Sequence, residues 1–134
     1  MANVRDARRE QSFPPWEGSC LEIFGSSPAE NRIGQVIVQP ATDSEPARGW
    51  RQAGGCRPEP AIRLHSTPTP DGYELAALIP LELLAIAPQS TEFLLEIGLT
   101  TCLPESAGEF VRPRAFAALT PPVSTTGYAR VRIR

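Results

Sequence analysis

The chain contains no lysine, one histidine (His65) and one methionine, its first residue. Its 13 basic residues are all arginine and stand against 15 acidic residues, which gives a net charge of -2. Because a nucleic-acid groove needs a net basic face, this balance argues against nucleic-acid binding. Catalysis by a serine triad could use only His65, and no Gly-x-Ser-x-Gly elbow presents a serine. We expect His65 to be a hydrogen-bonded or exposed strand residue.

Long apolar runs are also missing. No run approaches the roughly 20 residues that a bilayer-spanning helix needs, and the first residues lack the apolar stretch of a signal peptide. We therefore expect a soluble chain with no membrane contact and no export signal in the residues given. The cysteines have no CxxC spacing, so they indicate neither a zinc site nor a closed disulfide framework, and at most one pair can bridge. They are Cys20, which we expect to be buried within a strand, Cys56 and Cys102.

The 134 residues fit one domain, 1–134, which is long enough to form a core without disulfides or metals. Fifteen prolines, about twice ordinary usage, indicate many short elements joined by stiff loops. This pattern, with turn signals and little helix, predicts an all-β fold, an antiparallel β-sandwich of the immunoglobulin or jelly-roll kind. Apolar alternation with a period of two predicts strands at 20–24, 33–39, 61–66, 73–79, 92–100 and 128–133, and 110–119 is expected to be extended.

Turn-forming residues define the middle of the chain. Residues 67–72 contain Pro-Asp-Gly, in which proline presets φ for a turn, so the two flanking strands are expected to form a hairpin. Pro80 cannot donate to a strand ladder and ends the second strand. Residues 81–87 are then expected to make one helical or 3₁₀ turn, with Leu83 and Leu84 filling an end of the core.

Three further expectations concern faces and loops. In 92–100, the best candidate for a central strand, Glu96 lies on the face opposite the apolar residues and is expected to be solvated. Residues 40–60 show no periodicity and are expected to form a long surface loop around Trp50. The alternate arginines at Arg130, Arg132 and Arg134 are expected to form a solvated outer face.

Few residues could support catalysis. Glu22 and Glu96 are both mid-strand and could act as acid and base across a concave sheet, but the sequence does not set their separation. We rank an enzyme last and expect no catalytic residue. Sugar binding asks for less: an aromatic plane for the sugar ring and a few polar side chains for its hydroxyls. Trp16 and Glu22 supply one of each.

Several segments resemble the family 9 carbohydrate-binding modules and their sugar-binding relatives. That family has a tryptophan followed by Asp-Ser-Val-Glu-Ile-Phe, and Trp16 with Ser19-Cys20-Leu21-Glu22-Ile23-Phe24 is similar to this segment. Gly72 to Leu84 looks like the family's Gly-Tyr strand, which ends in Ile-Pro and a leucine turn. The resemblance implies that Trp16 stacks on a sugar and that Glu22 hydrogen-bonds its hydroxyls. Gly34 to Val38 and Gly127 to Val131 look like two other strands of the family.

Other positions depart from the family pattern. The family's aspartate is Ser19 here, its arginine falls on Ile37 and its glutamate on Ala76. For the family's second stacking tryptophan this chain offers Phe116 or Phe110, and Phe116 is the candidate for the other half of a sugar sandwich. Calcium is common in the family, but the replaced aspartates argue against it, so we expect no metal and no cofactor.

The family's first strands have no counterpart in this sequence. Either the start is truncated, or another segment completes the sheet. The leading interpretation is a non-catalytic carbohydrate-binding module-like domain that binds a mono- or oligosaccharide, and the resemblance suggests an extracellular or periplasmic location. The alternative is a structural or protein-interaction β-sandwich without sugar binding. In that case Trp16 and Trp50 pack loops, and an exposed sheet edge recruits a partner or a second copy to form a homodimer.

Overall fold

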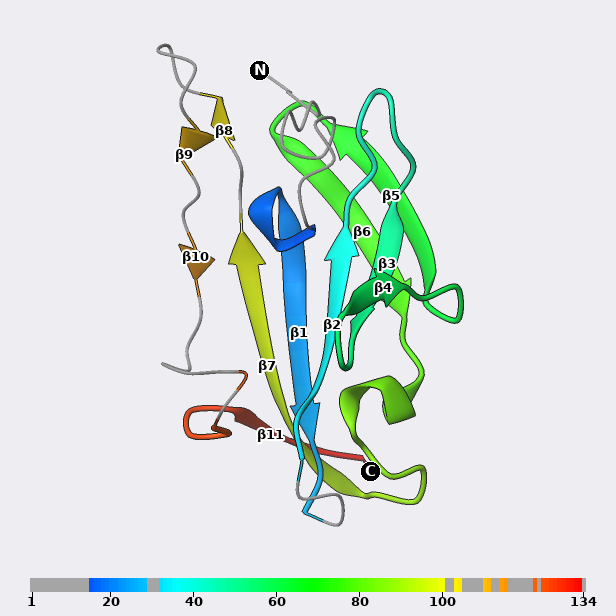
Figure 1. Cartoon of the computed structure of the whole chain (residues 1–134), viewed down its shortest axis with the longest axis vertical. Coiled ribbons are helices and arrows are strands. Elements are labelled where there is room, and N and C mark those ends of the chain that lie inside the picture. Colours follow the sequence, from blue (N-terminus) through cyan, green and yellow to red (C-terminus); the bar gives the residue numbers. More distant parts are fainter. Residues whose placement is uncertain are drawn as a thin grey trace.

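A computed structural model of the chain describes residues 15–28, 32–100, 103–104, 110–111, 114–115, 122 and 124–133. These residues form antiparallel strands and two short 3₁₀ helices, which confirms the expected all-β, sandwich-like fold (Figure 1). In chain order the elements are η1 (Pro15–Glu17), β1 (Cys20–Ser26), β2 (Gly34–Gln39), β3 (Arg48–Gln52), β4 (Cys56–Pro58), β5 (Arg63–Thr69), β6 (Gly72–Leu78), η2 (Leu81–Leu84), β7 (Glu92–Thr100), β8 (Leu103–Pro104), β9 (Phe110–Val111), β10 (Arg114–Ala115) and β11 (Ala129–Arg132).

The main sheet has the strand order β10-β7-β1-β2-β3-β4, and β11 pairs with the first half of β7. The longest pairing joins β1 to β7, from Cys20 opposite Thr100 to Ser26 opposite Leu94. As predicted, the strand at 92–100 is therefore central (Figure 1). Among the described strands, β8 pairs with β9 apart from this sheet.

The second layer consists of the β5–β6 hairpin and η2, and the hairpin runs obliquely to the main strands (Figure 1). The predicted hairpin is confirmed, with Thr69 opposite Gly72 across a two-residue turn. Leu83 and Leu84 of η2 are buried, as expected. Apolar side chains from both layers fill the space between them: Ile23, Val36, Val38, Ile62, Leu83, Leu84 and Ile86, with Leu64, Leu75, Ile79, Leu81, Phe93 and Leu95 around them.

Two glycines allow η2 to lie against the sheet. Gly25 of β1 and Gly34 of β2 are opposite one another in the register. A Cβ atom on Gly25 would lie 2.6 Å from Leu84 Cβ, and one on Gly34 would lie 2.5 Å from Ala85 N. The pair therefore forms a notch without side chains, and the backbone of η2 fits into it.

The segment 40–60 differs from the expectation of a loop. It contains β3 and β4, which extend the main sheet beyond β2. Trp50 of β3 lies opposite Ile37 of β2, and its Nε1 donates a hydrogen bond to Gln39 Oε1 at 2.7 Å. The prediction was wrong because pairing with the β2 backbone, rather than apolar alternation, places β3 in the sheet.

The second layer leaves part of the main sheet uncovered. Phe93 and Leu95 pack against the core, but Ile97 and Leu99 on the same face of β7 are 51% and 42% exposed. Leu78, at the end of β6, is also exposed. Within the described part of the chain, this face ends in an open apolar surface.

The C-terminal strand β11 carries the expected arginine face. Arg130 and Arg132 are exposed, and both bond the Glu92 carboxylate, at 2.6 and 2.8 Å. Arg134 lies outside the described residues. None of the described helices has the length and apolar character needed to cross a membrane.

Candidate functional site

The face of the main sheet that points away from the core carries polar side chains on neighbouring strands. Glu22 of β1 lies opposite Gly98 of β7, and Phe24 lies opposite Glu96. Because residues two apart on a strand share a face, Glu22 and Glu96 are diagonal neighbours on the same face. Their side chains are 5% and 6% exposed, so the structure brings the two mid-strand glutamates together in a buried position.

Glu22 lies beside an amide. Gln35 Nε2 of β2 donates to Glu22 Oε1 at 3.4 Å. Burial of a carboxylate is unfavourable unless polar groups surround it, and this long hydrogen bond supplies part of that environment. Glu22 is therefore held in place from the neighbouring strand rather than extended into solvent.

Glu96 corrects the expectation of a solvated glutamate. Its Oε1 accepts a hydrogen bond from the backbone N–H of Ile97 at 2.9 Å. The Tyr128 ring, which packs with Phe24, lies close enough for an electrostatic effect. Burial, and secondly the Glu96 charge, raise the pKa of Tyr128 to about 12. Tyr128 therefore stays neutral beside the carboxylate over the whole physiological pH range.

Further polar groups follow the same face onto β3. Gln39, only 2% exposed, accepts the hydrogen bond from the Trp50 indole. Among the described residues, Gln52 Oε1 and the Thr100 hydroxyl are buried and have no hydrogen-bond partner. Buried polar groups without partners are uncommon in folded proteins and lower stability.

The tryptophan chosen from the sequence lies at one end of this face. Trp16 belongs to η1, which contacts the adjacent ends of β1 and β2, and its side chain is half-buried. Glu22 is the third residue of β1, about 7 Å along the strand from its first residue. Both residues therefore belong to the same end of the sheet. The third predicted site residue, Phe116, lies outside the described residues.

The sequence reasoning missed the glutamines of this face. Gln35 and Gln39 share one face of β2 with the buried Ile37, and Val36 and Val38 face the core, so the period of two along the strand places both glutamines opposite the core. This signal was present in the sequence. No comparable signal marked Gln52, because it belongs to a strand that the periodicity did not reveal.

Nucleophiles and metal ligands are scattered. His65 is exposed on β5, as expected, and its Nε2 lies 3.3 Å from Thr67 Oγ1. Cys20 is buried, as expected, and Cys56 is a half-buried free thiol, while Cys102 lies outside the described residues. In the described ranges, no group of three histidine, cysteine or acidic residues is arranged to hold a metal ion.

The fold and this face define an all-β, sandwich-like protein with a buried polar surface on its main sheet. No protein-family model, no curated protein and no solved structure matches the chain. The likeness to family 9 carbohydrate-binding modules therefore rests on the sequence segments alone and stays a prediction.

Proposed function

We propose that this chain is a non-catalytic, carbohydrate-binding module-like domain. A mono- or oligosaccharide stacks on Trp16, and Glu22 hydrogen-bonds its hydroxyls. The observation that carries the proposal is the position of Trp16 and Glu22 at one end of the sheet, with the Glu22 carboxylate held by Gln35. Such a site combines an aromatic surface with a few fixed polar groups, as small-molecule sites usually do.

The burial of polar groups supports a binding role. Glu22, Gln39 and Glu96 lie on the face away from the main core cluster, a face that also buries Phe24 and Ile37. Burying such groups lowers stability, and proteins retain them mainly where they serve recognition. A sugar brings both hydrogen-bond donors and acceptors, which suits a surface made of carboxylates and amides.

Glu22 and Glu96 are each more than nine-tenths buried, so only the small exposed part of Glu22 is open to a sugar hydroxyl. A hydrogen bond needs that one point of contact. A glycosidic reaction needs two carboxylates that both reach the bond and a water molecule, so the burial favours a role without catalysis. No cofactor is needed for stacking and hydrogen bonding.

A second candidate is a structural or protein-interaction β-sandwich without sugar binding. The exposure of Ile97 and Leu99 on the uncovered face of β7 favours it, because exposed apolar surfaces commonly mark contact sites. In this case Trp16 only packs η1 against the sheet. Dimers in solution, with no binding to any sugar, would favour this candidate over the first.

Calorimetric titration with a panel of mono- and disaccharides tests the proposed role of Glu22. Replacing a carboxylate that bonds sugar hydroxyls removes a charged hydrogen bond, so Glu22→Gln should weaken binding about tenfold or more. Glu74→Gln, on the exposed face of β6, is the matched control and should bind like wild type. Binding by Glu22→Gln at wild-type strength, with the variant folded, would refute the assigned role.

A further inference from the structure

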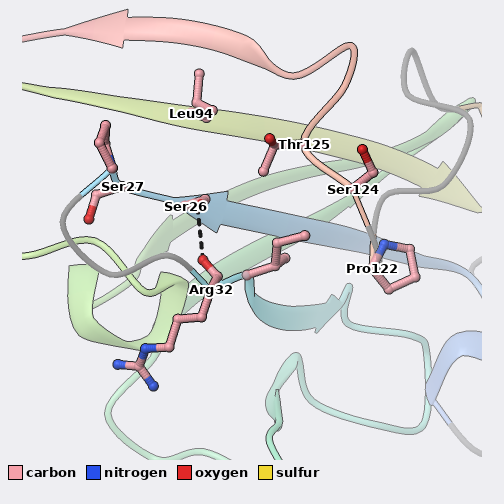
Figure 2. Close-up of a pocket in the computed structure, with 9 residues that line it drawn as sticks. Ser26, Ser27, Arg32, Leu94, Pro122, Ser124 and Thr125 are labelled. Atoms are coloured by element: carbon pink, nitrogen blue, oxygen red, sulfur yellow. Dashed lines mark hydrogen bonds between the residues drawn. The ribbon is translucent and has the colours of Figure 1, made fainter.

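A cavity of about 530 Å³ lies beside the last residues of β1, at the other end of this strand from Trp16 (Figure 2). It is bounded by four parts of the chain: the end of β1, residues 32–33 before β2, Leu94 of β7, and described residues 122, 124 and 125 before β11. From Cys20 to Ser26, β1 spans about 20 Å, so the cavity is separate from the Trp16 end of the sheet. Its volume lies within the range of about 300–1,000 Å³ typical of small-molecule sites.

The lining combines apolar walls with hydroxyl groups. Ile33 and Leu94 contribute apolar surface, and the hydroxyls come from three serines and Thr125. Arg32 is the only charged residue in the described lining, and no carboxylate belongs to it. In Figure 2 the Arg32 guanidinium points away from Leu94 and Thr125, so hydroxyl groups dominate the space between them.

Hydrogen bonds inside the protein already use the protons of the two β1 serines. Ser26 Oγ donates to the Arg32 carbonyl at 2.8 Å (Figure 2). Ser27 Oγ donates to the Ala85 carbonyl at 3.3 Å. Ser27 Oγ also accepts a hydrogen bond from the Ala87 N–H at 3.4 Å and the residue is only 1% exposed, so its hydrogen bonding is already satisfied. Ser26 Oγ keeps its lone pairs and meets a ligand mainly as an acceptor.

The opposite wall follows the same pattern with one exception. Ser124 Oγ donates to Thr126 Oγ1 at 3.0 Å and accepts from the Thr126 N–H at 3.2 Å, so its proton is in use and one lone pair remains. Within the described residues Thr125 Oγ1 makes no hydrogen bond, so it can supply one donor and further acceptor capacity. In the described lining, Ser26 and Ser124 therefore offer acceptors and Thr125 offers both a donor and an acceptor, which fits a ligand that brings its own O–H groups.

We propose that this cavity is a second binding site, for a neutral polyol of monosaccharide size. The polyol donates hydroxyl protons to the serine oxygens, and its C–H surface packs on Leu94 and Ile33. An anion such as phosphate or a carboxylate brings only acceptors, which duplicates the lone pairs already present. The site does not depend on the Trp16 platform, and either site can exist without the other.

A titration followed by amide nuclear magnetic resonance separates the two sites. The probes are methyl α-glucopyranoside and myo-inositol, with inorganic phosphate as the anionic comparison. We expect the polyols to shift the amide signals of Ser26 and Thr125 in a saturable way. When a polyol occupies only the cavity, the signal of the Trp16 indole should not change. Shifts confined to the Trp16 indole would overturn the cavity site while supporting the proposed function. Shifts of the Ser26 and Thr125 signals with phosphate but not with the polyols would also overturn the cavity site. So would the absence of any shift at the cavity with all three probes.

Two threonine variants test the contacts directly. Thr125→Val keeps the shape of the side chain and removes its hydroxyl, so polyol binding at the cavity should weaken about fivefold, the value of one ordinary hydrogen bond. Thr91→Val removes an exposed hydroxyl that does not line the cavity and should leave binding unchanged. Equal affinities of the two folded variants for the polyols would contradict the proposed contacts.

Discussion

The notch formed by Gly25 and Gly34 gives the fold its sharpest test, through Gly34→Ala. A Cβ atom at position 34 would lie 2.5 Å from Ala85 N and 2.6 Å from Leu83 O. Both are backbone atoms, so no side-chain rotation can relieve the contact. The turn that holds Leu83 must therefore move away from the sheet, and Leu83 belongs to the main core cluster.

The expected loss of stability follows from two opposing effects. Overpacking a close contact costs about 1–3 kcal/mol, and contacts to backbone belong at the upper end of that range. Alanine in a strand recovers roughly 0.5–1 kcal/mol relative to glycine. The net expectation for Gly34→Ala is a loss of about 2 kcal/mol, which corresponds to a fall in Tm of about 6–10 °C for a chain of this size.

Urea unfolding and thermal melting of Gly34→Ala measure this loss. The control is Gly54→Ala, because Gly54 has a φ of 64° but no atom within 4 Å of an added Cβ. It should lose only about 1 kcal/mol, from the left-handed backbone. If Gly34→Ala were as stable as wild type, η2 would not lie in the notch, and the account of how the two layers pack would be wrong.

Three other predictions concern hydrogen bonds and charges. Trp50→Phe should lower the free energy of unfolding in urea by about 1–3 kcal/mol, because it leaves the buried Gln39 Oε1 without its donor; a smaller loss would contradict the importance of this bond. Hydrogen bonding to Arg132 holds the pKa of Glu92 below its ordinary value of 4.5. Wild type should therefore be more stable than Glu92→Gln above pH 4.5 and lose this advantage as the pH falls below it. An unchanged advantage in acid would refute the pairing. Burial raises the pKa of Tyr128 from 10.0 to about 12, so the stability that its neutral form contributes should be complete up to pH 10 and be lost as the pH rises toward 12. Tyr128→Phe should make the free energy of unfolding fall less steeply over this range, and an identical fall in wild type and variant would argue against a buried tyrosine.

The strand pattern was predictable where one face of a strand packs on the core. Residues 92–100 alternate so regularly that the limits of β7 match the prediction, and the Pro-Asp-Gly turn located the β5–β6 hairpin. β3 was not predictable in this way. Its sequence, Arg-Gly-Trp-Arg-Gln, has no apolar alternation, and its place depends on backbone pairing with a strand elsewhere in the sequence.

The candidate site was predictable in part. The sequence shows Trp16 six residues before Glu22, and in the structure Trp16 lies in η1 beside the start of β1, of which Glu22 is the third residue. The burial of Glu96 could not be predicted, because its surroundings include Tyr128, which is 32 residues away and comes near it only in the folded chain. The cavity beside Ser26 was also missed, since four separate segments form its walls.

Tryptophan fluorescence during titration with mono- and disaccharides, each paired with its methyl glycoside, tests the central claim most directly. The comparison is between wild type, Trp16→Ala and Trp50→Phe, the last retaining the proposed stacking residue. The account predicts a saturable change in wild type and Trp50→Phe that is lost in Trp16→Ala. Loss of the change with the methyl glycosides alone would show that the site reads a reducing end. No change with any sugar, or a full change in folded Trp16→Ala, would contradict the proposed sugar platform.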